Sequence, residues 1–253
     1  MRQIKPTGTY YKIIDDYVTR EIQPVPKQTQ NICDVFLNGL PLDEVHSVYI
    51  KGEMNPIYDI DFSVLSDTMS DDSTTALEKR ILDEFGLELD CIVNNRDGFD
   101  WYERFRITCI YGHDISVRHL HKKHLPVLLQ EDIDSIKLLY EWLSHYLDEG
   151  HPLLLKNYRL FIKLILRNTF LTTKLDVYTR DLYYCQKFIA EKYPYYNDIT
   201  RMLLQAYLDG DENAEVRMYN GTKLRIANLK PNRESLSKAL QAFPSGPHFI
   251  ECD

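Results

Sequence analysis

An Asp-Ile-Asp triplet, Asp59 to Asp61, interrupts an otherwise apolar run of the chain, Tyr-Asp-Ile-Asp-Phe-Ser-Val-Leu. The β-branched and aromatic residues of this run predict a strand. Side chains alternate along a strand, so Asp59 and Asp61 share one face, whereas Ile60 and Phe62 share the other. The two carboxylates then point the same way, about 7 Å apart along the strand.

Two like charges on one face of a sheet are costly unless a positive group neutralises them. Mg²⁺ suits this task because it prefers oxygen ligands and is often held by one or two carboxylates plus substrate phosphates. A second predicted strand, Leu-Glu-Leu-Asp-Cys-Ile-Val-Asn, offers Glu88 and Asp90 on a common face. Such a site activates a hydroxyl for in-line attack on a nucleotide phosphate. The alternative is that Asp59 and Asp61 lie on a solvated face at a sheet edge.

The remaining patterns divide the chain into two parts. The first part mixes helices, predicted over 8–23, 31–40 and 74–85, with strands predicted over 47–52, 58–65, 87–94 and 105–112. From about Glu131 onward nearly every segment has helical periodicity, and we predict helices over 132–147, 152–171, 178–193, 196–208 and 232–243. The predicted fold class is therefore α+β, with domain boundaries at 1–125 and 126–253.

With these residues the chain resembles nucleotidyltransferases of the polymerase-β type. The pattern of that superfamily is a strand that ends in Gly-Ser or Gly-Gly, a short loop, an Asp-x-Asp on the next strand and a third acidic residue further on. Gly52, the Asp59–Asp61 triplet and Asp90 occupy those places. The second part resembles the helical C-terminal domain of bacterial aminoglycoside nucleotidyltransferases. The resemblance implies a small mixed-sheet nucleotidyltransferase core followed by an all-helical substrate- and nucleotide-binding domain.

The same resemblance implies a Mg²⁺-dependent enzyme that transfers a nucleoside monophosphate, AMP from ATP, to a hydroxyl of a small-molecule acceptor such as an aminoglycoside. Asp59 and Asp61 would bind the metal, and Gly52 would contact the nucleotide. Asp90 would be the third ligand or the general base, with Glu88 as its substitute. A protein or tRNA acceptor is also compatible with the superfamily.

Two features depart from the superfamily pattern. Glu53 stands where the second small residue is expected, and a glutamate there would repel the terminal phosphates of a nucleotide. The loop between Gly52 and Asp59 is also shorter than usual. A second hypothesis is therefore a catalytically degenerate member that acts as a nucleotide-sensing or partner-binding module.

Basic residues recur at spacings of three, four and four in one predicted helix: Lys156, Arg159, Lys163 and Arg167. This spacing places them along one side of the helix. Two interpretations stay open, either that the stripe binds nucleotide phosphates, chiefly through Lys163 and Arg167, or that it forms salt bridges with neighbouring helices or is solvated. Arg180 either joins this stripe or merely begins its own helix.

Composition sets outer limits on function. The 253 residues carry a net charge of −8, which argues against nucleic acid as the main partner without excluding it. We expect no membrane span, because no run of about 18 apolar residues occurs. The five scattered cysteines have no metal-binding spacing and indicate free thiols in a reducing cytoplasm. The N-terminus lacks the apolar region of a secretory signal.

Overall fold

The computed structural model describes residues 10–20, 25–52, 58–95, 99–151, 155–210, 215–217, 220–229 and 231–244. The chain forms two compact units. Residues 19–120 make up most of the first, which we call the sheet unit, and residues 10–18 with 121–253 make up the second, the helical unit. Together they give an α+β fold.

The sheet unit is built on four strands in the order β5-β4-β3-β6. They are β3 (Ser47–Lys51), β4 (Asp59–Leu65), β5 (Glu88–Asn94) and β6 (Ile107–Gly112). β3 runs antiparallel to both β4 and β6, whereas β4 and β5 are parallel. A parallel pair needs a crossover connection, and helix α2 (Thr75–Phe85) provides it. The other helices of this unit are α1 (Lys27–Asn38) and α3 (Trp101–Arg106).

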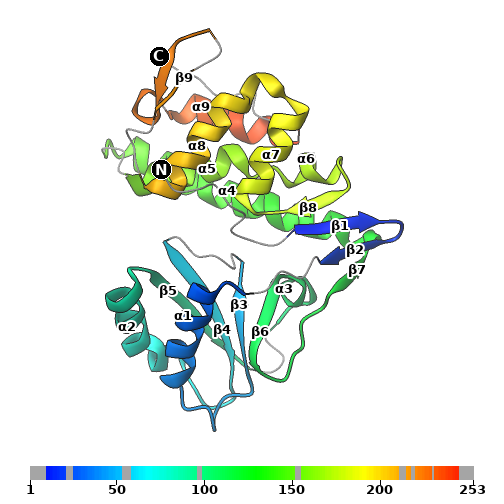
Figure 1. Ribbon diagram of the computed structural model, residues 1–253, viewed down its shortest axis with the longest axis vertical. Helices are drawn as coiled ribbons and strands as arrows, with labels where there is room; N and C mark the ends of the chain where they lie inside the picture. Colours follow the sequence, from blue (N-terminus) through cyan, green and yellow to red (C-terminus); the bar gives the residue numbers. More distant parts are fainter. Residues whose placement is uncertain are drawn as a thin grey trace. The chain divides into compact units, whose positions relative to one another are not determined.

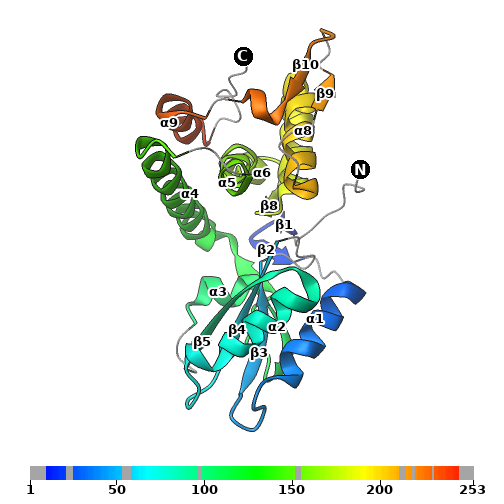
Figure 2. The same cartoon turned by 90° about the vertical axis from the view of Figure 1, so that its left-hand side faces the viewer.

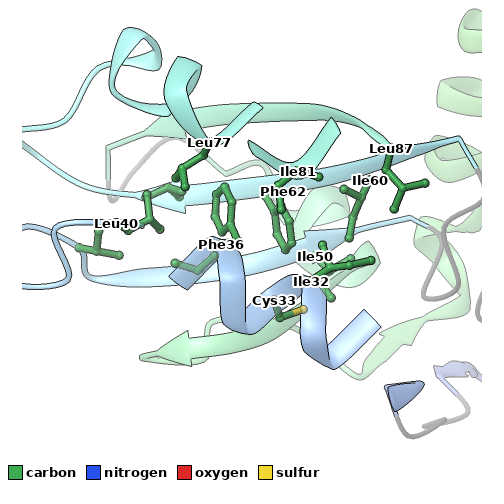
Figure 3. Packing of buried hydrophobic residues seen from close by; sticks show 13 residues of the cluster. Ile32, Cys33, Phe36, Leu40, Ile50, Ile60, Phe62, Leu77, Ile81 and Leu87 are labelled. Carbon is green, nitrogen blue, oxygen red and sulfur yellow. The ribbon is translucent and has the colours of Figure 1, made fainter. Parts of the chain in front are cut away.

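Helices α1 and α2 cover one face of this sheet (Figure 2). Their apolar sides place Ile32, Phe36 and Ile81 against the strands, where the ring of Phe36 stacks on that of Phe62 at a centroid distance of 4.1 Å (Figure 3). Gly86 ends α2 in the left-handed conformation, with φ of 68°, and its N–H donates to the carbonyl of Leu82. Only glycine adopts this conformation without strain, so the sequence fixes where the helix stops.

The helical unit contains six helices among its described residues (Figure 1): α4 (Leu125–Asp148), α5 (Leu155–Leu166), α6 (Thr169–Thr173), α7 (Leu182–Lys192), α8 (Asn197–Asp209) and α9 (Arg233–Gln241). A second sheet has the order β7-β2-β1-β8, formed by β1 (Tyr10–Ile14), β2 (Tyr17–Arg20), β7 (His119–His121) and β8 (Val177–Thr179). A short hairpin joins β9 (Glu215–Arg217) to β10 (Lys223–Arg225). No helix in the described part of the chain is long and apolar enough to cross a bilayer.

Three predictions of secondary structure were wrong. The helix predicted over 8–23 is the hairpin β1–β2, in which Tyr11, Ile13 and Val18 are buried and Asp15 turns the chain with φ of 52°. The second part is not all helical, because β8 and the β9–β10 hairpin interrupt it. The helix predicted over 152–171 ends at Leu166, and α6 starts anew where the side chain of Asn168 accepts a hydrogen bond from the N–H of Leu171.

Candidate active site: a carboxylate face on the four-stranded sheet

Four carboxylate side chains share one face of the sheet. In the parallel pair β4–β5, Asp61 lies opposite Asp90 and Asp59 lies opposite Glu88. Residues in register on neighbouring strands are about 4.8 Å apart and point to the same face. The chain thus brings together the four acidic residues that the sequence singled out, and we call this surface the carboxylate face.

Burial separates the carboxylate face from the opposite face of the same strands. Ile60 and Phe62 are buried against α1 and α2, whereas Asp59 and Asp90 are exposed and Asp61 is half-buried. The predicted alternation along β4 is therefore confirmed. β4 is an interior strand of the sheet, so Asp59 and Asp61 do not lie at a sheet edge. Glu88 and Asp90, in contrast, sit on the edge strand β5, where a ligand can reach them.

Gly52 follows β3 immediately and turns the chain away beside Asp61. Its φ is +68°, a conformation that L side chains rarely adopt, and a Cβ added to it would lie 3.7 Å from Oδ2 of Asp61. The glycine therefore leaves backbone rather than a side chain next to this carboxylate. Glu53, the residue that departs from the superfamily pattern, lies outside the described residues.

A lysine that the sequence reasoning missed also lies on the carboxylate face. Lys51 is in register with Asp61 across the β3–β4 pair, and its Nζ is 3.7 Å from Oε1 of Glu103 and 5.7 Å from the ring centroid of Phe99. Phe99 itself packs with Tyr49 and other apolar residues of this face. The sequence pattern that could have identified Lys51 is the alternation along β3, which puts Lys51 on the same face as the buried Tyr49. The position of Lys51 opposite Asp61 depends on the strand register as well.

The carboxylate oxygens of this face can supply part of the coordination shell of a metal ion, and a bound ligand would have to supply the rest. Among the residues described, no group of three or more histidine, cysteine or acidic side chains is arranged to hold a metal ion. Mg²⁺, however, is commonly bound by one or two carboxylates, with water and phosphate oxygens filling the other positions. Asp61 and Asp90, directly opposite one another, match that requirement.

The basic residues predicted to bind nucleotide lie in the helical unit. Nζ of Lys163 lies 5.9 Å from the ring centroid of Tyr207 on α8, a cation–π arrangement. Arg167 comes directly after the last residue of α5, and its N–H donates to the carbonyl of Lys163. Their role in nucleotide binding stays a prediction.

Arg180 has a partner within the same unit. Its Nε lies 3.3 Å from Oδ1 of Asp132, a carboxylate with 0% exposure, and the hydroxyl of Tyr178 donates to the other oxygen of Asp132 at 2.9 Å. Arg180 also precedes α7, which begins at Leu182 after the capping residue Asp181. This geometry gives Arg180 a structural task, which is the neutralisation of a buried carboxylate.

Comparisons with known proteins leave the family open. No family model matches the chain, and no curated protein matches it. Among solved structures, the chain is similar to a chain from a complex of a tri-AMPylated HEPN toxin of Shewanella oneidensis with its MNT antitoxin, at 13% identity, covering 48% of this chain and 94% of that one with a TM-score of 0.26. A chain from a toxin–antitoxin structure with AMP-PNP is 13% identical; the match covers 48% of this chain and 97% of that one, with a TM-score of 0.27. A further protein from Shewanella oneidensis is 14% identical; the match covers 49% of this chain and 97% of that one, with a TM-score of 0.27. TM-scores of this size carry no conclusion about fold or activity.

Proposed function

We propose that this protein is a Mg²⁺-dependent nucleotidyltransferase that moves AMP from ATP to a hydroxyl of a small-molecule acceptor. The observation that supports the proposal is the register of β4 and β5, which sets Asp61 opposite Asp90 and Asp59 opposite Glu88 on one accessible face. The net charge of −8 is compatible with a polycationic acceptor such as an aminoglycoside. Free cysteines at positions 33, 91, 109 and 185 are compatible with action in the cytoplasm.

In the proposed reaction the acceptor oxygen attacks the α-phosphorus of ATP. The bond from that phosphorus to the oxygen bridging to the β-phosphate breaks, pyrophosphate leaves, and the acceptor proton passes to a carboxylate. Bound Mg²⁺ would neutralise phosphate charge and align the groups. Asp59 and Asp61 would hold it from β4.

Asp90 is the proposed third ligand or general base, because it lies opposite Asp61 and is exposed to an incoming acceptor. Glu88 is the proposed substitute for Asp90; it lies two positions earlier on β5, opposite Asp59. Mutation separates the ligand role from the base role. Loss of a base removes transfer but keeps nucleotide affinity, whereas loss of a metal ligand lowers both.

A second candidate function is nucleotide-dependent binding without turnover. The observation that favours it is the lack, among the described residues, of a three-ligand group that could hold a metal without help from a ligand. A protein of this kind would bind nucleotide on the carboxylate face but release no pyrophosphate with any acceptor.

The test incubates the full chain with ATP labelled at the α-phosphate, Mg²⁺ and a panel of hydroxyl-bearing acceptors, with pyrophosphate release measured in parallel. We expect label to reach an acceptor in wild type and in Asp83→Asn, which removes an exposed carboxylate of α2 on the other side of the sheet. Asp61→Asn should abolish transfer. Asp90→Asn should abolish transfer with nucleotide affinity largely kept if Asp90 is the base, and with nucleotide affinity reduced if Asp90 is a metal ligand. Nucleotide binding without any transfer would favour the second candidate function.

A further inference from the structure

The carboxylate face carries one basic side chain from its own strands. Lys51 is the sole lysine or arginine in β3, β4, β5 and β6. It is in register with Asp61 of β4 and lies 3.7 Å from Oε1 of Glu103 on α3, so its nearest charged partners on this face are acidic. A single lysine in such a position influences every cation that binds there, because like charges repel at short range.

The ammonium group of Lys51 is held in place. Only 23% of its side chain is exposed, and it lies between the carboxylate of Glu103 and the ring of Phe99. Glu103 is itself fixed, because its Oε2 accepts a hydrogen bond of 3.2 Å from the N–H of Asp100 in a capping box at the start of α3. The lysine therefore stays on the face that it shares with Asp61.

We propose that Lys51 is the resident cation of the carboxylate face, which weakens the binding of a divalent metal on its own and makes that binding depend on a phosphate-bearing ligand. This inference rests on the proposed function and specifies how the same site admits its metal. The positive charge of Lys51 opposes a bare divalent cation. A triphosphate brings negative charge that attracts both Lys51 and the metal, so metal and nucleotide bind together more tightly than either does alone.

Coulomb's law gives the expected size of the effect. A divalent and a monovalent cation about 6 Å apart in water repel each other enough to change affinity about tenfold, and salt reduces this. Removing the charge of Lys51 should therefore tighten the binding of a bare divalent cation by about three- to tenfold. It should also reduce the factor by which ATP enhances metal binding, because part of that enhancement came from relieving the repulsion.

The experiment measures Mn²⁺ binding to the full chain by electron paramagnetic resonance, with and without ATP. We expect Lys51→Met to bind Mn²⁺ alone about three- to tenfold more tightly than wild type and to show a smaller enhancement by ATP. Lys51→Arg keeps the charge and should behave like wild type. Lys79→Met removes the same charge from the exposed side of α2, on the other side of the sheet, and should change nothing. Lys51→Gln repeats the measurement if Lys51→Met fails to fold.

Unchanged or weaker Mn²⁺ binding in Lys51→Met would overturn the role of Lys51 while leaving the proposed function standing. Equal tightening in Lys79→Met would overturn it as well, because the cause would then be net charge alone. Absence of Mn²⁺ binding in wild type and in all variants, with and without ATP, would overturn the proposed function and the role of Lys51 with it. Binding of Mn²⁺ alone by Lys51→Met but not by wild type would support the proposal.

Discussion

The two faces of the four-stranded sheet are made by alternate residues of the same strands, yet they serve different ends. On the helix-covered face, Ile60 and Phe62 are packed into a core that excludes water (Figure 3). On the carboxylate face, Asp59 and Asp61 lie opposite Glu88 and Asp90. A period of two thus lets one strand supply apolar contacts to the core from one side and carboxylates to the accessible face from the other. Substitutions on the two faces should therefore affect different measurable quantities.

The largest expected effect is on the helix-covered face. Phe62 is 1% exposed and stacks on Phe36. Phe62→Ala should lower the free energy of unfolding by about 3–5 kcal/mol, because it removes apolar contacts and leaves a cavity. Urea denaturation followed by circular dichroism measures this loss. A loss below about 1 kcal/mol would show that the helix-covered face does not carry the stability of the sheet unit.

A similar effect is expected at the buried ion pair of the helical unit. Arg180→Met leaves Asp132 buried without its cation and should cost about 3 kcal/mol, the lower end for such pairs, since Arg180 is 33% exposed. Arg201→Met, which removes an exposed arginine of α8, is the matched control and should have little effect. Wild-type stability in Arg180→Met, combined with weakened ATP binding, would instead favour nucleotide binding by Arg180.

Thiol reactivity also distinguishes the faces. Burial raises the pKa of the Cys33 and Cys91 thiols, which lie on the helix-covered face, to about 12. Burial raises the pKa of Cys109, on the carboxylate side, by less. In a Cys252→Ser background, which removes the one cysteine outside the described residues, Ellman's reagent at pH 8.5 should label Cys109 first, because its thiolate is more populated. Cys33, which is buried, should react at the rate of unfolding, and Cys91, which is half-buried, should react after Cys109. If either reacts before Cys109, the assignment of faces is contradicted.

These raised pKa values also predict a loss of stability at high pH. The unfolded thiols ionise near their ordinary value of 9.0, whereas the folded thiols of Cys33 and Cys91 stay protonated up to about pH 12. Their protonated form is thus favoured by folding, and this contribution is complete below pH 9 and is lost as the pH rises from 9 towards 12. Urea denaturation at pH 8, 9 and 10 should show a falling free energy of unfolding, and Cys33→Ala should reduce the slope above pH 9.

The smallest expected effect on stability is that of Asp61→Asn. Removing one of several clustered like charges should leave the free energy of unfolding unchanged within about 0.5 kcal/mol or raise it slightly. The same urea denaturation measures it. Destabilisation by more than about 2 kcal/mol would mean that the Asp61 carboxylate is a structural hydrogen-bond acceptor.

The parts of the fold that were predictable are those with strong local signals. β4, β5 and α2 follow from alternation, from a helical apolar period and from Gly86, which are all readable within a few residues. The capping box at Asp100 and Glu103 was also present in the sequence and would have predicted α3. The clustering of carboxylates on one face needed only the alternation of each strand.

The rest depends on contacts between distant parts of the chain. The segment 8–23 has apolar residues compatible with either a helix or a hairpin, and the pairing of Tyr11 with Tyr178 on β8 selects the strand. The position of Lys51 opposite Asp61 depends on strand register, which no local pattern fixes. For Arg180 the sequence left nucleotide binding and a helix start both open, because no residue near it in the sequence predicts its contact with the buried Asp132, 48 positions earlier.

The most direct test of the central claim, that the carboxylate face is a metal-dependent nucleotide site, is a thermal-shift titration of ATP with and without Mg²⁺. A ligand that binds the folded protein alone raises its melting temperature in proportion to occupancy and affinity. We predict that ATP raises the melting temperature of wild type and of Asp83→Asn only when Mg²⁺ is present, and that Asp61→Asn shows no such rise. A rise of equal size without Mg²⁺, or one that Asp61→Asn retains, would contradict the account.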